Sequence, residues 1–178
     1  MPRMISGPYQ GLLLNFFSKM INPSKILELG TFTGYSTICL ARGLKSNGTI
    51  ITVEKNDQLK TITQKYFKLT NLFHKITQIF GEALKIIPSL DNDFDLVFID
   101  ADKREYLDYY KLIFDKVKKG GFILVDNVFW NGKVIEPINP KDTYTKGIID
   151  FNEFVRNDKR VEKITLNLRD GLMILRKK

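Results

Sequence analysis

The sequence predicts an α/β fold: a doubly wound, mostly parallel sheet of seven strands, with helices on both faces and an antiparallel C-terminal hairpin. Between residues 25 and 126, apolar runs of strand length alternate with amphipathic segments of helical length, a pattern typical of a parallel sheet. Two further segments, 161–168 and 171–177, alternate apolar and polar residues and are separated by Arg169-Asp170. So short a connection indicates a hairpin, which we expect at one edge of the sheet.

The expected elements follow in order along the chain. Apolar residues at helical spacing predict a helix over 7–21, which Pro23 ends. No linker, repeat or low-complexity segment interrupts the pattern, so one domain over 1–178 is predicted. Strands are expected at 25–30, 48–54, 75–81, 94–100 and 120–126, and helices at 34–44, 57–70, 82–87, 103–118 and 145–157.

Composition excludes several classes of protein. No apolar run approaches the ~18 residues of a membrane-spanning helix, so we expect no membrane partner. A single cysteine, Cys39, excludes an internal disulfide and indicates a reducing compartment, the cytoplasm. One cysteine and one histidine, His74, are too few for a zinc site of soft ligands. The net charge of +8 is spread along the chain, which favours general lysine enrichment over a nucleic-acid footprint.

Small and acidic residues stand where the predicted parallel strands end. They are Gly30, Glu54, Gly81, Asp100 and Asp126. Sheets of this kind bind ligands at the carboxyl ends of their strands, so these residues predict a binding rim.

The first part of this rim is the segment LELGTFTGYS, residues 27–36. Gly30 and Gly34 let a ligand approach the backbone closely, but their spacing is not that of dinucleotide-binding or phosphate loops. Glu28 is an ionisable group inside an apolar strand, where a lone charge is costly, so it favours a cationic ligand. The alternative is a purely structural strand–turn–helix. Glu54 stands where an acid commonly binds both ribose hydroxyls of a nucleoside; the alternative is a helix cap.

Five segments together resemble the metal-dependent class I O-methyltransferases, the family of caffeoyl-CoA and catechol O-methyltransferases, in its bacterial branch. The segments are ILELGTFTGYST, TVEKN, LVFIDADKREY, GGFILVDNVFWNG and DGLMIL. The resemblance implies a Rossmann-like sheet and S-adenosylmethionine as cofactor. It assigns Glu28, Gly30, Phe32, Gly34 and Ser36 to the methionine end, Glu54 and Lys55 to the ribose, Gly81, Glu82 and Ala83 to the adenine edge, and Asp100 to the same pocket.

A metal site is expected where two neighbouring strands end. Asp100, Asp126 and Asn127 would converge there as three oxygen ligands, which favour Mg²⁺, with Mn²⁺ or Ca²⁺ as alternatives. The resemblance assigns the same three residues to the metal. The alternatives are a helix N-cap for Asp100 and a turn for Asp126-Asn127.

Lys103 stands in the first turn of a predicted helix, where a cation opposes the helix dipole. The resemblance makes it the catalytic residue, as general base or as electrostatic partner of the ionised acceptor hydroxyl. Trp130 either walls the acceptor pocket or packs in the core. Cys39 and His74 receive no role.

The resemblance therefore implies methyl transfer from S-adenosylmethionine to a hydroxyl of a small, metal-chelated, catechol-like phenol. It also raises a homodimer as an expectation, and the helical extension of the relatives is expected to be absent. Three alternatives stay open: a tRNA hydroxyuridine O-methyltransferase, which the positive charge would suit, a non-catalytic S-adenosylmethionine-binding module, and an NAD-dependent oxidoreductase.

Overall fold

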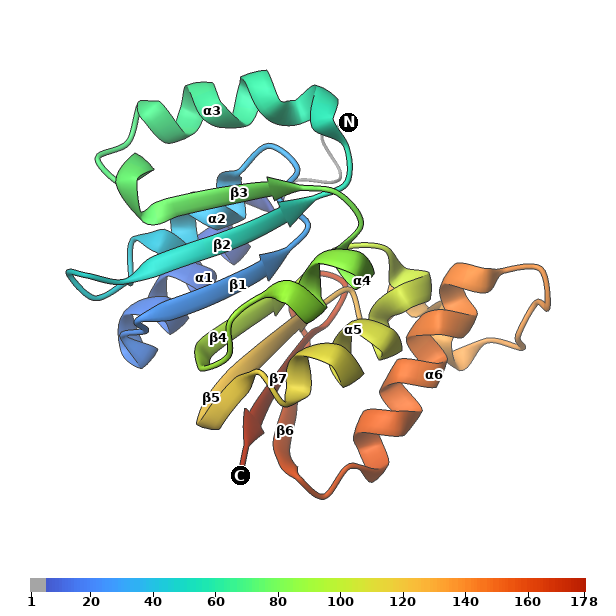
Figure 1. Ribbon diagram of the computed structural model, residues 1–178. Coiled ribbons are helices and arrows are strands. Elements are labelled where there is room, and N and C mark those ends of the chain that lie inside the picture. Colours follow the sequence, from blue (N-terminus) through green and yellow to red (C-terminus); the bar gives the residue numbers. More distant parts are fainter. Residues whose placement is uncertain (1–5) are drawn as a thin grey trace.

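A computed structural model describes residues 6–178, and its centre is a seven-stranded sheet in the order β3-β2-β1-β4-β5-β7-β6 (Figure 1). The strands β1 to β5 run parallel, whereas β7 is antiparallel to both β5 and β6. The predicted fold class, including the edge hairpin, is confirmed. The strands are β1 (Lys25–Leu29), β2 (Thr49–Glu54), β3 (Ile76–Phe80), β4 (Phe94–Ile99), β5 (Val117–Asp126), β6 (Val161–Leu166) and β7 (Leu172–Lys177).

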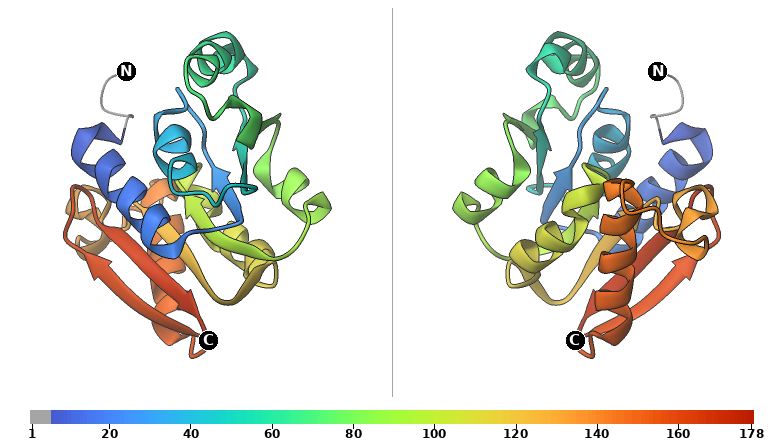
Figure 2. Two further views of the ribbon diagram at one scale, coloured as in Figure 1. Left: turned by 90° about the vertical axis from the view of Figure 1, so that its left-hand side faces the viewer. Right: turned by 90° about the vertical axis from the view of Figure 1, so that its right-hand side faces the viewer.

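Helices cover both faces of this sheet. In Figure 1 the helices α4, α5 and α6 lie in front of it, with α1 and α2 behind, and the side views of Figure 2 show the same layers. In the part of the chain that the structure describes, no helix has the length and apolar character needed to cross a membrane. The helices are α1 (Gly7–Ile21), α2 (Tyr35–Ala41), α3 (Lys60–Lys68), α4 (Ala83–Ile86), α5 (Tyr106–Phe114) and α6 (Thr143–Asn157).

Each face of the sheet buries its own apolar core. Alternate residues of a strand point to opposite faces, so Leu27 and Leu29 of β1 pack on the side of α4, α5 and α6. Ile26 packs on the opposite side with α1 and α2. Glu28 shares that second face, where it lies fully buried. This two-sided burial explains why the central strands are almost continuously apolar.

Two predicted boundaries between β4 and β5 were wrong. The helix expected over 103–118 is a short 3₁₀ turn, Lys103–Glu105, followed by α5, which ends at Phe114. Strand β5 then begins at Val117, three residues earlier than expected, and pairs there with Phe94. Val117 is buried in the core while the polar residues that follow it are not. Helical spacing had predicted that the helix continues to residue 118. Burial of the Val117 side chain places the start of the strand there instead.

The hairpin connection is also longer than predicted. Leu166 pairs directly with Leu172, so residues 167–171 form the turn in place of Arg169-Asp170 alone. Arg169 adopts a φ of +50°, and the Gly171 N–H donates to the carbonyl of Leu168 at 2.9 Å. Helix α6 begins two residues early because the Asp142 carboxylate accepts the Thr145 N–H at 3.1 Å.

Gly30 is where the first strand meets the end of β4. Its φ is +97°, and a Cβ built on it would lie 2.0 Å from the carbonyl oxygen of Asp100. Only glycine permits both the left-handed backbone and this approach. The neighbouring strand β4 therefore creates the requirement for glycine at this position. Gly30 in turn lets the loop after β1 lie against Asp100.

We predict that Gly30→Ala lowers the free energy of unfolding by at least about 3 kcal/mol, because strain in φ and a steric clash add. Gly132→Ala is the matched control. Gly132 has a φ of +82° but nothing within 4 Å of a built Cβ, so only the cost of the left-handed backbone, about 1 kcal/mol, is expected. Urea denaturation measures both, and equal losses would contradict the close approach.

Candidate active site

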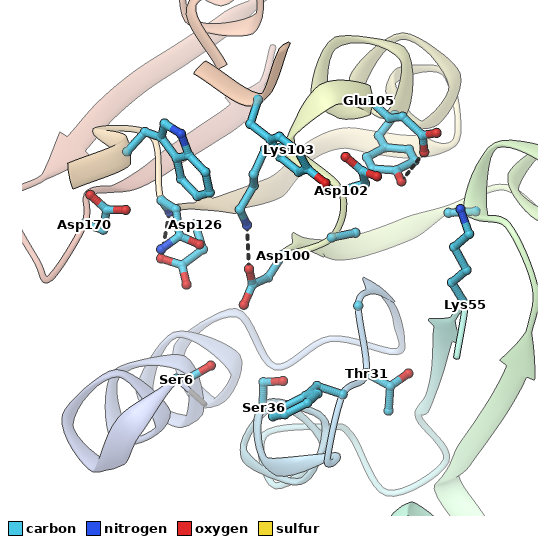
Figure 3. Close-up of a pocket in the computed structure, with 18 of the residues that line it drawn as sticks. Ser6, Thr31, Ser36, Lys55, Asp100, Asp102, Lys103, Glu105, Asp126 and Asp170 are labelled. Carbon is cyan, nitrogen blue, oxygen red and sulfur yellow. Dashed lines mark hydrogen bonds and ion pairs between the residues drawn. The ribbon is translucent and has the colours of Figure 1, made fainter. Parts of the chain in front are cut away.

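A cavity of about 1140 Å³ opens at the carboxyl ends of the parallel strands. This is more than the ~300–1,000 Å³ of a typical small-molecule pocket, so it has room for two ligands side by side. Most of the residues predicted for the rim line it. They are Gly30, Phe32, Ser36, Glu54, Lys55, Gly81, Glu82, Ala83, Asp100, Lys103, Asp126 and Asn127. Figure 3 shows five of them on several different elements: Ser36, Lys55, Asp100, Lys103 and Asp126.

Glu28 and Gly34 are not among the lining residues. Glu28 lies beneath the loop, where its Oε2 accepts hydrogen bonds from the hydroxyls of Thr37 and, at 2.6 Å, Thr52. Burial, opposed by these bonds and reinforced by the charge of Asp100, raises the pKa of Glu28 to about 7. Gly34 instead faces α3, where a built Cβ would lie 2.4 Å from the Phe67 ring.

The carboxylate of Glu54 fixes the loop that follows β1. Its two oxygens accept the Phe32 N–H at 2.8 Å and the Asn56 N–H at 2.9 Å. Each carboxylate oxygen has a second lone pair, so Glu54 can still accept two hydroxyl groups from a ligand in the cavity. Glu54 is not the helix cap that was its alternative role. Asn56 caps the following helical turn, because its side chain accepts the Gln58 N–H.

Asp100 and Asp126 are neighbours because the strands before them are in register. Ile99 pairs with Val125, so the next residue of each strand carries its carboxyl group into the same part of the cavity. Asp126 is only 3% exposed. Burial first, and then the negative charge of Asp100, raise the pKa of Asp126 to about 6.

The hydrogen bonds of Asp126 come from neutral donors. Gln10 of α1 donates its side-chain amide to Oδ2 at 2.7 Å, and the Asn127 N–H donates to Oδ1 at 2.9 Å. None of the ion pairs among the described residues involves Asp126. The N-cap alternative for Asp100 is filled by Asp102, whose carboxylate accepts the Arg104 N–H.

This donor set fits a hard divalent cation. Two adjacent carboxylates and the Asn127 amide offer only oxygen ligands, and positive charge between them would relieve their repulsion. Over residues 6–178, no group of three or more His, Cys, Asp or Glu side chains forms an alternative metal cluster. The predicted set therefore contains two charged ligands and one neutral one.

Lys103 brings a positive charge directly beside Asp100. The residue is 7% exposed, and its ammonium donates to Asp100 Oδ1 at 2.7 Å (Figure 3). A buried ammonium with a carboxylate partner and a side facing the cavity can stabilise a negative oxygen of a ligand.

Aromatic rings form one wall of the cavity beside the carboxylates. The rings of Trp130 and Tyr144 stack at 6.2 Å between centroids with an interplanar angle of 14°. The guanidinium of Arg104 lies 4.8 Å from the centre of the Tyr144 ring. Trp130 lines the cavity and also packs against the core, so its predicted role beside an acceptor stays a prediction.

Sequence reasoning missed several lining or supporting residues. Ser6, Tyr109, Tyr144, Arg169 and Asp170 line the cavity, and Gln10 supports it from α1. Gln10 lies on the buried face of an amphipathic helix, and a polar residue at such a position was the available signal. Arg169 donates to Gln10 Oε1 at 3.0 Å, a contact between the two ends of the chain that no local pattern encodes.

Comparison with known proteins identifies the family. A model of the O-methyltransferase family matches residues 1–178. Caffeoyl-CoA O-methyltransferase 2 of Petunia hybrida is 34% identical over 185 residues, which cover 98% of this chain and 76% of the relative. The chain belongs to the O-methyltransferase family. The family resemblance seen in the five motifs is thereby confirmed.

Solved structures of O-methyltransferases share the whole fold. One is the O-methyltransferase TomG of Streptomyces achromogenes, which is involved in tomaymycin synthesis and was solved with SAM. Its TM-score is 0.95 at 29% sequence identity, and the match covers 100% of this chain and 83% of the TomG chain. The O-methyltransferase of Bacillus cereus, solved with SAH, has a TM-score of 0.91 at 31% sequence identity. This match covers 97% of this chain and 82% of the Bacillus cereus chain. The O-methyltransferase chain described here thus shares its architecture with proteins that bind the methyl donor or its product.

For this O-methyltransferase, we predict that Gln10→Ala lowers the free energy of unfolding by about 1–3 kcal/mol, because it leaves a buried carboxylate oxygen of Asp126 without its donor. Gln58→Ala, at an exposed position, is the control and should change stability by no more than about 0.5 kcal/mol. Urea denaturation compares them. A loss at Gln10 no larger than at Gln58 would show that the hydrogen bond to Asp126 contributes nothing.

Glu28 gives a prediction about pH. Its folded pKa of about 7 lies above the ordinary value of 4.5, so its contribution to stability is complete below pH 4.5 and is lost as pH rises towards 7. The loss should be about 3 kcal/mol, since one pKa unit corresponds to about 1.4 kcal/mol. Glu28→Gln should remove this part of the pH dependence, whereas Glu153→Gln, at an exposed position, should keep it. Unfolding of the ligand-free chain by urea across this range measures it, and parallel curves for wild type and Glu28→Gln would contradict the assignment.

Proposed function

We propose that this chain transfers a methyl group from S-adenosylmethionine to a phenolic hydroxyl of a small acceptor, with the help of a divalent cation. The observation that carries the proposal is the convergence of Asp100, Asp126, Asn127 and Lys103 on one cavity large enough for donor and acceptor together. Binding of SAM and SAH by the neighbouring structures supports the choice of donor.

The donor would occupy the side of the cavity formed by the ends of β1, β2 and β3. There the loop after Gly30 leaves the backbone accessible, and Glu54 has lone pairs for two ribose hydroxyls. Asp100 and Ser36 would face the methionine end, and Gly81, Glu82 and Ala83 the adenine. The cavity contains carboxylates and backbone rather than a cluster of cations on this side, which suits a positively charged sulfonium better than a pyrophosphate.

The acceptor would lie between the carboxylates and the aromatic wall. Trp130 and Tyr144 offer flat apolar faces that match an aromatic ring. The plant relatives are named for a caffeoyl group, which carries two adjacent phenolic hydroxyls. A catechol presents the same pair of oxygens to Asp100, Asp126 and Asn127, so we propose a catechol-like acceptor.

The residues of the chain would divide the chemistry between them. When bound, S-adenosylmethionine supplies the methyl group and Mg²⁺ makes a nearby hydroxyl more acidic. Asp100, Asp126 and Asn127 would hold the cation, with Gln10 fixing the orientation of Asp126. Lys103, held as an ammonium by Asp100, would stabilise the ionised acceptor oxygen. The rest of the rate enhancement would come from alignment of the two ligands in a shielded cavity.

The first test is methyl transfer from labelled S-adenosylmethionine to catechol or to unmodified tRNA, each with Mg²⁺ or with a chelator. We expect transfer to catechol that stops on chelation and returns with Mg²⁺. Transfer to tRNA alone would replace the proposed acceptor with the nucleic-acid alternative, and transfer that survives chelation would reject the metal.

The buried free Cys39 is consistent with our expectation that the chain works in the cytoplasm.

We predict that Asp126→Ala lowers the kcat for catechol at least ~100-fold, because it removes one of two charged metal ligands. Binding of S-adenosylmethionine, measured by calorimetry, should change less than about threefold, since Asp126 lies on the acceptor side. The control is Asp150→Asn on the surface of α6, which should leave both quantities unchanged. Full turnover by Asp126→Ala would reject the assignment of Asp126 to the metal.

A further inference from the structure

Tyr106, at the start of α5, lies behind Lys103 and is completely buried. Its ring packs edge-to-face against Phe151 of α6, with 5.8 Å between centroids and an interplanar angle of 83°. Because Tyr106 is outside the cavity lining, it cannot touch a ligand there. Its hydroxyl group nevertheless reaches two parts of the site.

The hydrogen bonds of this hydroxyl have a defined direction. The Lys103 ammonium lies 2.5 Å from the Tyr106 oxygen, and an ammonium can only donate. Tyr106 must therefore accept from Lys103, which leaves its own O–H to donate to the backbone carbonyl of Asp126 at 3.1 Å.

The same geometry leaves Lys103 one donor for a ligand. An ammonium has three N–H groups, of which one donates to Asp100 Oδ1 and one to Tyr106. Lys103 also lines the cavity, so its third N–H is free to meet a ligand oxygen. The lysine chain is flexible, and two fixed partners restrict where this third donor points.

From these contacts we infer that Tyr106 is a positioning residue, which holds the Lys103 ammonium against the end of β5 so that its remaining N–H faces the acceptor. The inference rests on the proposed function for the identity of the acceptor. The hydroxyl links Lys103, on the loop after β4, to the backbone of Asp126, at the end of β5. The ammonium and the carboxylates are thereby held at a fixed separation.

The test compares Tyr106→Phe with Tyr110→Phe. Tyr110 lies one turn later on α5, is equally buried and also packs edge-to-face on Phe151, at 5.9 Å, but its hydroxyl donates to Asp158 at 3.0 Å, away from Lys103. Both variants remove one buried hydroxyl, and thermal unfolding is used to check that both are folded. With catechol as acceptor, Tyr106→Phe should lower kcat about 10- to 100-fold with KM changed less than about twofold, since it removes a hydrogen bond to a charged group. Tyr110→Phe should leave kcat within about twofold.

A second measurement does not depend on turnover. In protein labelled with ¹⁵N-lysine, an ammonium held by fixed hydrogen bonds in a buried site exchanges its protons slowly and gives a side-chain NMR signal. The Lys103 signal is identified by its loss in Lys103→Met. We expect it to disappear or broaden in Tyr106→Phe and to persist in Tyr110→Phe.

The outcomes separate the inference from the proposed function. A wild-type chain that methylates no acceptor defeats the proposed function, and the NMR comparison then decides the inference by itself. An unchanged Lys103 signal in Tyr106→Phe, or equal kcat values for the two tyrosine variants of an active enzyme, overturns the role of Tyr106.

Discussion

The site depends on two carboxylates placed side by side at the tips of neighbouring parallel strands. The register of β4 and β5 sets Asp100 beside Asp126, and burial makes their mutual repulsion costly. The groups that donate hydrogen bonds to them reduce that cost. Lys103 neutralises one carboxylate, Gln10 and a backbone N–H solvate the other, and the donor set is suited to a divalent cation.

Elements from the whole chain converge on this pair. Helix α1 contributes Gln10, which in turn accepts from Arg169 in the turn between β6 and β7. Behind the carboxylates, Tyr106 joins Lys103 to the end of β5. A site assembled from both ends of the chain forms only when the fold is complete, which couples its geometry to overall stability.

The side of the cavity proposed for the methyl donor is shaped mainly by backbone. Gly30 allows the loop after β1 to approach the end of β4 closely. The Glu54 carboxylate holds that loop by accepting a hydrogen bond from the Phe32 N–H. Glu28, beneath it, joins α2 to the sheet through the hydroxyls of Thr37 and Thr52. A surface made mainly of backbone and a few carboxylates suits a cationic ligand.

The sequence by itself determined the fold class, the residues at the strand ends and the family, because alternation of apolar strands with helices and the order of strand-end residues are local patterns. Most of the residues that it predicted for the site do line the cavity, including Asp100, Lys103 and Asp126. Only the tertiary structure decided that Glu28 lies beneath the cavity, that β5 begins at Val117, and that Gln10, Tyr106 and Arg169 support the site. Those outcomes depend on which face of an element becomes buried and on contacts between distant segments, and a local pattern cannot specify a partner that lies more than a hundred residues away.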